Sequence, residues 1–143
     1  GCDLIVASDE ARFSEIFAQR ALSLDFGGSF LLPRLVGMHK AKELALFGDI
    51  ISAAEADRIG LVNRVVPAAE LDDFVANWAT RLAHGPTQAL SSTKLLLNQS
   101  LETSFEKAVE AEGLAQSVNF YSEDTQEAMR AFTEKRAPKF TGR

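Results

Sequence analysis

Residues 48–67 read GDIISAAEADRIGLVNRVVP, and this stretch decides the fold class. The segment Ser52-Ala53-Ala54-Glu55 has the form of a capping box, in which a Ser hydroxyl and a Glu carboxylate satisfy the free amides of a first helical turn. A short helix closed by Gly60 is therefore expected. Residues 61–66 are rich in β-branched side chains and predict a short strand that Pro67 ends. With few strands and many helices along the chain, the residues alone predict a mostly helical protein with a small β edge.

The residues upstream add two more strands and a loop. Residues 4–7 form a nearly continuous apolar run, which is the pattern of a strand buried on both faces. A turn at Asp9-Glu10 then leads to a short strand at 11–13. Residues 14–28 have no clean period and end in paired glycines, so they are predicted to be a loop.

Helices dominate the rest of the chain. Helices are expected over 29–36 and 38–47, each followed by a glycine. Residues 71–82 give the clearest helical pattern, with one apolar stripe made of Leu71, Phe74, Val75, Trp78, Ala79 and Leu82. Further helices are predicted after Pro86, from a capping box at 103–106 to about Phe120, and from Ser122 or Asp124 to Lys135-Arg136. The buried side of the helix that ends near Phe120 is predicted to carry Phe105, Val109, Leu114 and Val118.

Composition excludes several classes of protein. The 143 residues carry a formal net charge of −5 and no basic run, which argues against nucleic acid as a main partner. No apolar stretch approaches the ~20 residues that span a bilayer, so no membrane partner is expected. The single cysteine, Cys2, rules out an internal disulfide and favours a cytoplasmic setting. His39 and His84 have no partner at metal-ligand spacing, so we predict no metal site.

Asp25 is the residue whose chemistry stands out. It follows the apolar residues 22–24 and precedes Phe26-Gly27-Gly28, so its carboxylate leaves an apolar loop close to a helix start. Two interpretations follow from this position. In one, Asp25 caps the helix or an Asx turn. In the other, it transfers protons. No nucleophile elbow, phosphate loop or dinucleotide fingerprint accompanies it.

The order of these segments resembles the crotonase, or enoyl-CoA hydratase/isomerase, superfamily. The resemblance rests on CDLIVA at 2–7, ARF at 11–13, GGS at 27–29 and LPRLVG at 32–37, on AKEL at 41–44, GDIISA at 48–53 and GLVNRVVP at 60–67, and on AFTEKR at 131–136. It covers essentially the whole chain but only the second half of a family member. It implies an α/β fold, with the end of a spiral of ββα turns and the active-site loop in residues 1–67. Residues 68–143 would form the C-terminal helical region that builds trimers.

The resemblance also implies an acyl-CoA enzyme in which two backbone amides stabilise an enolate. Both amides belong to the upstream half, so the chain is expected to be part of a longer protein. Hydratases of the family use two glutamates, and one of them stands in a Pro-Glu pair that reads Ile16-Phe17 here. Glu15 lies two residues before Phe17 and is a poor substitute on alignment. Asp25 falls where dienoyl-CoA isomerases, 4-chlorobenzoyl-CoA dehalogenases and epoxyphenylacetyl-CoA isomerase-like members carry an aspartate. Residues 24–34 are particularly similar to the last of these groups.

The resemblance therefore favours proton-shuttling isomerisation of an unsaturated acyl-CoA, with Asp25 as the base. Phe132 and Lys135 match positions that meet the adenine and phosphate of CoA, which is part of the substrate, so no separate cofactor is expected. The partners would be an acyl-CoA and copies of the same chain, as a trimer or a dimer of trimers. Two alternatives stay open: an enoyl-CoA hydratase of fatty-acid degradation, and a truncated, non-catalytic assembly subunit.

Overall fold

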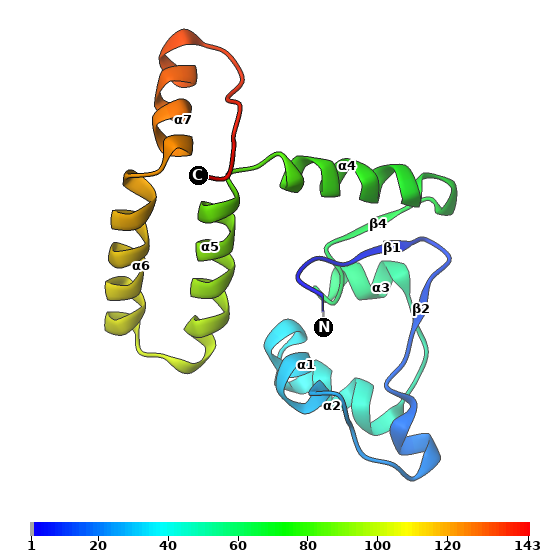
Figure 1. The fold of residues 1–143 in the computed structure, drawn as a ribbon. Coiled ribbons are helices and arrows are strands. Elements are labelled where there is room, and N and C mark those ends of the chain that lie inside the picture. Colours follow the sequence, from blue (N-terminus) through cyan, green and yellow to red (C-terminus); the bar gives the residue numbers. More distant parts are fainter. Residues whose placement is uncertain (1) are drawn as a thin grey trace. The chain divides into compact units, whose positions relative to one another are not determined.

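The structure is a computed structural model that describes residues 2–143 as two compact units, one ending at Ala76 and the other covering Asn77–Arg143 (Figure 1). In the first unit the elements are β1 (Val6–Ser8), β2 (Arg12–Phe13), the 3₁₀ helix η1 (Ile16–Arg20), α1 (Gly28–Val36), α2 (Met38–Phe47), β3 (Ile51–Ser52), α3 (Ala53–Arg58), β4 (Arg64–Val66) and the 3₁₀ helix η2 (Ala68–Glu70). Helix α4 (Leu71–Ala83) crosses the division. The second unit contains α5 (Thr87–Gln99), the 3₁₀ helix η3 (Ser100–Glu102), α6 (Phe105–Phe120) and α7 (Glu123–Glu134).

Two short strand pairs form the β part of the first unit. Strand β1 pairs with β4 in parallel, with Ala7 opposite Val65. Asn63 extends this pair, because its side-chain oxygen accepts a hydrogen bond from Ile5 N at 2.7 Å and its own N–H donates to Ile5 O at 2.8 Å. Strand β2 pairs with β3 in antiparallel register, with Phe13 opposite Ile51. The predicted strands are thus present but shorter than expected, and β3 had no counterpart in the prediction.

Only one of the two hydrogen bonds of the predicted capping box forms at the start of α3. Ser52 is the N-cap, and its hydroxyl accepts a hydrogen bond from Glu55 N at 3.2 Å. The Glu55 carboxylate does not return to the Ser52 amide, because it pairs with Arg58 at 2.6 Å and with Lys40 at 3.6 Å. A guanidinium offers that carboxylate two charge-assisted hydrogen bonds, which outweigh one bond to an amide. The predicted helix is therefore confirmed, with a different role for its glutamate.

Small and branched apolar side chains make the core of the first unit. One cluster consists of Ala7, Ala56 and Val62, from β1, α3 and the segment before β4. The other joins α1 to α2 and consists of Leu32, Ala41 and Leu44. Ile51 and Leu61 touch both clusters. Helices α1 and α2, predicted over 29–36 and 38–47, are confirmed to within one residue.

The loop predicted over 14–28 contains a helix. Its residues 16–20 form η1. The sequence shows no helical periodicity here, because contacts with residues far along the chain hold this helix in place. The side-chain nitrogen of Gln19 donates to Phe47 O and Gly48 O, both at 3.0 Å, and so binds η1 to the end of α2.

The apolar faces of the second unit are more open than predicted. The residues expected on the buried side of α6 are exposed: Phe105 79%, Val109 48%, Leu114 66% and Val118 57%. This prediction is wrong for the described chain, because α6 packs against α5 and α7 and nothing covers its remaining face. The stripe on α4 is likewise half-buried at best, with no buried residue. The cap of α6 is Ser104 rather than Thr103, and its hydroxyl accepts from Lys107 N at 3.4 Å.

Candidate functional site

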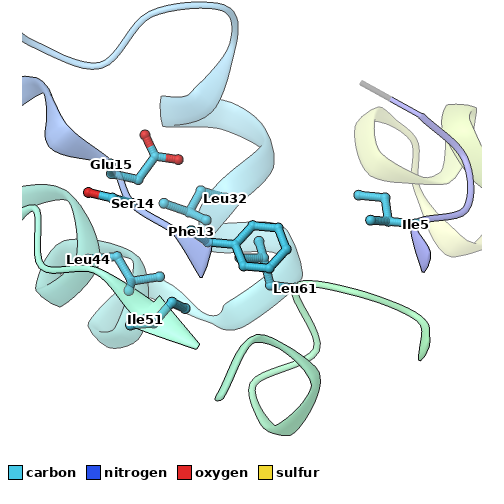
Figure 2. Close-up of a pocket in the computed structure, with 8 residues that line it drawn as sticks. All are labelled: Ile5, Phe13, Ser14, Glu15, Leu32, Leu44, Ile51 and Leu61. Atoms are coloured by element: carbon cyan, nitrogen blue, oxygen red, sulfur yellow. The ribbon is translucent and has the colours of Figure 1, made fainter. Parts of the chain in front are cut away.

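A cavity of about 190 Å³ lies in the first unit, between the two core clusters (Figure 2). Strand β2 and the residues after it supply one wall, and α1, α2 and β3 supply the others. The lining is apolar except for Ser14 and Glu15, and consists of Ile5, Phe13, Ser14, Glu15, Leu32, Leu44, Ile51 and Leu61. A small apolar cavity with few polar groups is the usual form of a site for an organic ligand.

Glu15 is the one ionisable group on this lining. Its side chain is half-buried, and within residues 2–143 its carboxylate makes no hydrogen bond or ion pair. Burial, and secondarily the charge of Asp25, raise the pKa of Glu15 above its usual value. A carboxylate that is taken out of water and has no cation or hydrogen-bond donor beside it is destabilised, so the neutral carboxyl form is favoured. Sequence reasoning set Glu15 aside on alignment, and only the fold places it on a cavity.

The backbone around Glu15 is tied to the end of α2. The Ser14 hydroxyl donates to Gly48 O at 2.8 Å, next to the two bonds from Gln19. Gly48 adopts the left-handed conformation with φ of 64° and caps α2. A Cβ added at Gly48 would lie 3.2 Å from Glu15 O, so the close approach of the two segments depends on this glycine.

Asp25 begins a tight turn. The Gly28 N–H donates to Asp25 O at 2.8 Å, and the two residues between them, Phe26 and Gly27, have φ of 53° and 79°. Positive φ at both central positions is the pattern of a type I′ turn. Phe26 is fully exposed at the tip, with 101% relative exposure.

The turn leaves the Asp25 carboxylate unused by the fold. The N-cap of α1 is Gly27, not Asp25, and no side chain caps the helix. Within the described residues the Asp25 carboxylate, which is exposed, makes no hydrogen bond or ion pair. Asp25 thus does not make the capping contact that the sequence suggested, and its carboxylate is available to a ligand.

Phe17, at the position of the hydratase glutamate, lies inside η1 and is half-buried. Its side chain can neither accept nor donate a proton. Glu15 and Asp25 are carboxylates on either side of η1, and the negative charge of Asp25 adds to the effect of burial in raising the pKa of Glu15.

Phe132 and Lys135 lie together at the end of α7, in the second unit. Phe132 is 85% exposed. Lys135 is the left-handed C-cap with φ of 55°, and its N–H donates to Phe132 O at 3.2 Å while Arg136 N donates to Ala131 O at 3.0 Å. This pair of bonds is a Schellman motif, in which glycine is the preferred residue. Asp25 belongs to the first unit, and the two groups of residues are each described on their own.

The other residues weighed from the sequence take surface or helix-end positions. His39 is exposed on α2, and His84 follows α4 with its Nδ1 2.8 Å from Thr80 O. Cys2 is exposed. Within residues 2–143, no group of three or more His, Cys, Asp or Glu side chains could hold a metal ion. None of the helices in that range is long and apolar enough to cross a membrane.

Comparisons with known proteins agree on one group. A family profile described as enoyl-CoA hydratase/isomerase matches residues 1–143. The chain is 37% identical to the crotonyl-CoA hydratase of Syntrophomonas wolfei subsp. wolfei, over 97% of this chain and 54% of the relative. It is 34% identical to the 1,2-epoxyphenylacetyl-CoA isomerase of Escherichia coli, over 100% of this chain and 55% of the relative. The crystal structure of an enoyl-CoA hydratase subunit I from Geobacillus kaustophilus superposes with a TM-score of 0.94 at 36% identity, over 99% of this chain and 55% of that one. The chain thus spans about half the length of the relatives it matches.

Proposed function

The chain belongs to the enoyl-CoA hydratase/isomerase family, and we propose that it is the part of an acyl-CoA isomerase that carries the catalytic base, Asp25. The reaction is the movement of a double bond along an unsaturated acyl chain through an enolate. One observation carries this proposal: Asp25 presents an exposed carboxylate that the fold itself does not use, whereas the position of the hydratase glutamate holds Phe17.

Isomerisation needs fewer groups than hydration. Asp25 takes a proton from the carbon next to the thioester carbonyl, and the electrons of that bond enter the conjugated system. Hydrogen-bond donors that face the thioester oxygen would stabilise the enolate, and we expect them from the remainder of the protein. Return of a proton at the far end of the system completes the shift. Hydration would require a second carboxylate to activate water, which Phe17 cannot supply.

Phe132 and Lys135 fit a role in binding CoA. An aromatic face and an ammonium group suit the adenine base and a phosphate, respectively. Phe132 contributes nothing to the core, and Lys135 adopts a backbone conformation that side chains rarely adopt. Strain of this kind is often found at ligand sites, so both residues are proposed as CoA contacts.

The second unit supports a role in assembly. Apolar side chains remain exposed along α5, α6 and α7, among them Leu97, Phe120 and Met129. Exposed apolar surface of this extent favours association with copies of the same chain. We propose that the helical region builds a trimer or a dimer of trimers, and that the enzyme acts in the cytoplasm.

Hydration is the second candidate, because relatives that match this chain include a crotonyl-CoA hydratase as well as an isomerase. The two reactions give products of different mass. The full-length protein should be incubated with 3-decenoyl-CoA and with 2-decenoyl-CoA, and the products should be separated by liquid chromatography, which resolves the two isomers, and then analysed by mass spectrometry. The isomerase proposal predicts conversion of the first substrate without a change in mass. A product that has gained one water from the second substrate would favour the hydratase, and no turnover of either substrate would favour an assembly subunit.

A further inference from the structure

Two neighbouring cations lie at the end of α7, and the fold uses only one of them. The Arg136 guanidinium donates to both oxygens of the Glu127 carboxylate, at 2.5 and 3.0 Å. It also donates to Glu134 Oε2 at 2.6 Å and to Ala137 O at 3.1 Å, so four of the five N–H groups of this guanidinium are occupied. In the described part of the chain the exposed Lys135 ammonium makes no hydrogen bond or ion pair. Lys135 is therefore the cation that remains for a ligand.

The backbone of Lys135 is held by the residues that follow it. Its φ of 55° is left-handed, which is unfavourable for a residue that has a Cβ. The next residue, Arg136, is joined to Glu127, nine residues earlier in α7. The Glu127 carboxylate also accepts a hydrogen bond from Lys139 N at 3.0 Å. One side chain of α7 thus fixes the chain at two points beyond Lys135, which offsets the unfavourable backbone conformation.

The same contacts neutralise the acidic groups beside Lys135. Arg136 forms ion pairs with Glu127 and with Glu134, the residue that directly precedes Lys135. A free carboxylate at either position would repel a phosphate group. An anionic ligand that approaches this end of α7 therefore meets the positive charge of Lys135.

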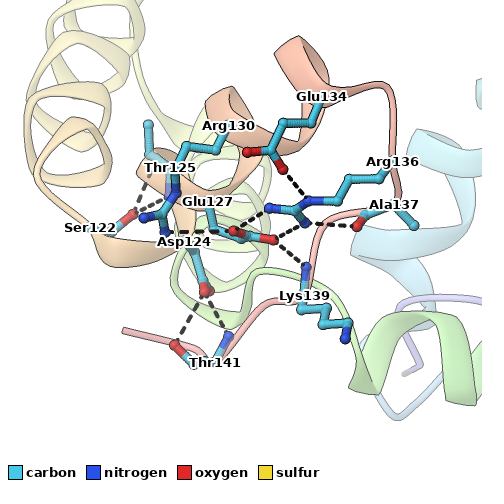
Figure 3. Close-up of polar contacts among 10 residues, drawn as sticks. All are labelled: Ser122, Asp124, Thr125, Glu127, Arg130, Glu134, Arg136, Ala137, Lys139 and Thr141. Carbon is cyan, nitrogen blue, oxygen red and sulfur yellow. Dashed lines mark hydrogen bonds and ion pairs between the residues drawn. The ribbon is translucent and has the colours of Figure 1, made fainter.

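The end of α7 is the turn of a hairpin. The last residues of the chain, 137–143, form a C-terminal segment that runs back along α7, where Thr141 N donates to Asp124 at 2.6 Å in the first turn of the helix. Figure 3 shows Asp124 and Glu127 reaching from α7 to the chain that follows it. We call residues 132–136 the α7 tip. Groups presented on a turn that is held in this way lose little conformational entropy when they bind a ligand.

We propose that Glu127 is a positioning residue for coenzyme A, because through Arg136 it holds the α7 tip in its binding conformation. In that conformation Lys135 meets a phosphate and Phe132 meets the adenine base. This inference rests on the proposed function, which makes Phe132 and Lys135 contacts of CoA. It adds that the affinity for CoA depends on a carboxylate whose own oxygens are occupied by Arg136 and Lys139.

Charge and positioning predict opposite effects of Glu127→Gln. The substitution removes a negative charge near the α7 tip and releases Arg136, and both changes would strengthen the attraction of the tip for phosphate. Loss of positioning weakens binding instead, because the tip must then be ordered at the moment when the ligand binds. The sign of the change in affinity therefore separates the two effects.

The test compares the binding of decanoyl-CoA and decanoyl-pantetheine to the full-length protein by isothermal titration calorimetry. The two thioesters share the acyl chain and the pantetheine arm, and only decanoyl-CoA carries the adenine nucleotide. Neither has a double bond to move, so the measurement does not depend on the reaction that the enzyme catalyses. The ratio of the two Kd values reports the contribution of the nucleotide. Damage to the acyl site changes both Kd values and leaves the ratio unaltered.

We expect Glu127→Gln to weaken the binding of decanoyl-CoA by about 5–10-fold, because fewer molecules then hold the α7 tip in its binding conformation. The Kd of decanoyl-pantetheine should not change. Arg136→Lys should have the same effect, since an ammonium keeps the charge but cannot make the two-pronged contact with Glu127. Circular dichroism verifies that both variants fold.

Two variants of the same helix serve as controls. Glu123→Gln removes an equal charge from an exposed residue, and Asp124→Asn loosens the C-terminal segment at its other end, at residues 141–142. Both should leave the ratio of the two Kd values unchanged. A loss in Asp124→Asn equal to that in Glu127→Gln would overturn the inference, because general loosening of the segment would then explain the weaker binding.

Lys135→Ala separates this inference from the proposed function. If Lys135→Ala weakens the binding of decanoyl-CoA alone and Glu127→Gln does not, Lys135 contacts CoA without help from Glu127 and the inference is wrong. Tighter binding of decanoyl-CoA by Glu127→Gln would also overturn it. If Lys135→Ala leaves the ratio unchanged, or if the protein binds neither thioester, the proposed CoA contact is itself wrong and the inference fails with it.

Discussion

Arg136 donates hydrogen bonds to both oxygens of the Glu127 carboxylate, at 2.5 Å from Nη1 to Oε1 and 3.0 Å from Nη2 to Oε2 (Figure 3). The same carboxylate accepts a hydrogen bond from Lys139 N at 3.0 Å. Two-pronged contacts between a guanidinium and a carboxylate are among the stronger polar contacts in proteins. Glu127 therefore fixes the chain that follows α7, together with the helix end that carries Phe132 and Lys135.

Glu127→Gln should loosen this C-terminal segment. The Arg136 guanidinium and the other contacts lower the pKa of Glu127 to about 2. Because the pKa in the folded state is depressed, the contact stabilises the fold fully above the unfolded value of 4.5 and is lost as pH falls from there to about 2. Hydrogen exchange at pH 7 should show several-fold faster exchange of the amides at residues 136–141 in the variant. Equal protection in the two proteins at pH 7 would contradict this role.

Asp124 provides the matched comparison. It is the buried polar residue of α7, 4% exposed, and its carboxylate accepts hydrogen bonds from Thr141 N at 2.6 Å and Gly142 N at 2.9 Å. Asp124→Asn should loosen the last residues, 141–142, while the Arg136 contact with Glu127 persists. The two variants thus release different parts of one segment.

Phe26→Gly should stabilise the protein. The left-handed conformation costs a non-glycine residue roughly 1–2 kcal/mol, and the exposed Phe26 ring offers no burial to offset that cost. Urea unfolding should show a gain of about 1 kcal/mol, of the same order as that of Ala21→Gly, whose native φ is 56°. A loss of stability in Phe26→Gly would mean that the ring makes contacts that stabilise the fold.

Gly48→Ala should destabilise the first unit by about 1–3 kcal/mol. An alanine at position 48 would have to keep the positive φ of the glycine, and its Cβ would lie 3.2 Å from both Glu15 O and Gln19 Cγ. Gly27→Ala is the control, because Gly27 is also left-handed, with φ of 79° and ψ of 9°, but the nearest atom to its added Cβ is Leu31 Cδ1 at 4.0 Å. Urea unfolding should therefore show a larger loss for Gly48→Ala, and equal losses would rule out crowding as the cause.

Glu15→Gln should change how stability depends on pH. The folded-state pKa of Glu15 is raised, so the folded protein binds this proton more tightly than the unfolded chain does. Stability is therefore lost as pH rises through the interval between the unfolded pKa and the raised folded one. The melting temperature of the variant should exceed that of the unaltered protein at pH 8, and the difference should shrink towards pH 4. A difference that is constant over this range would contradict the assignment.

The sequence predicted the fold well where local signals agree with tertiary contacts. Helices such as α2 and α7 have periodic apolar positions and terminal residues that mark their ends, and the order of segments led to the crotonase-type α/β fold, which the superposition confirms. Helix η1 was missed because hydrogen bonds from Gln19 to Phe47 O and Gly48 O, 28 and 29 residues further along the chain, hold it in place. The prediction of a buried side for α6 was wrong because periodicity identifies an apolar face of a helix but does not show what covers that face.

The site was predicted in part. Asp25 stood out from its apolar neighbours, but only the structure reveals that Gly27 caps α1 and leaves the carboxylate unused. Glu15 could not be identified from residue spacing, because its position on a cavity depends on lining residues that are spread along the sequence from Ile5 to Leu61. The roles of Asp25, Phe132 and Lys135 remain predictions, of which the Asp25→Asn experiment tests the first.

The isomerase turnover of Asp25→Asn in the full-length protein, with 3-decenoyl-CoA as substrate, shows whether Asp25 is the catalytic base. Asp57→Asn, which alters an exposed aspartate on α3, serves as the control. We expect Asp25→Asn to lower kcat by about 10³-fold or more, with folding intact, and Asp57→Asn to leave turnover unchanged. Full turnover in a folded Asp25→Asn protein would contradict it.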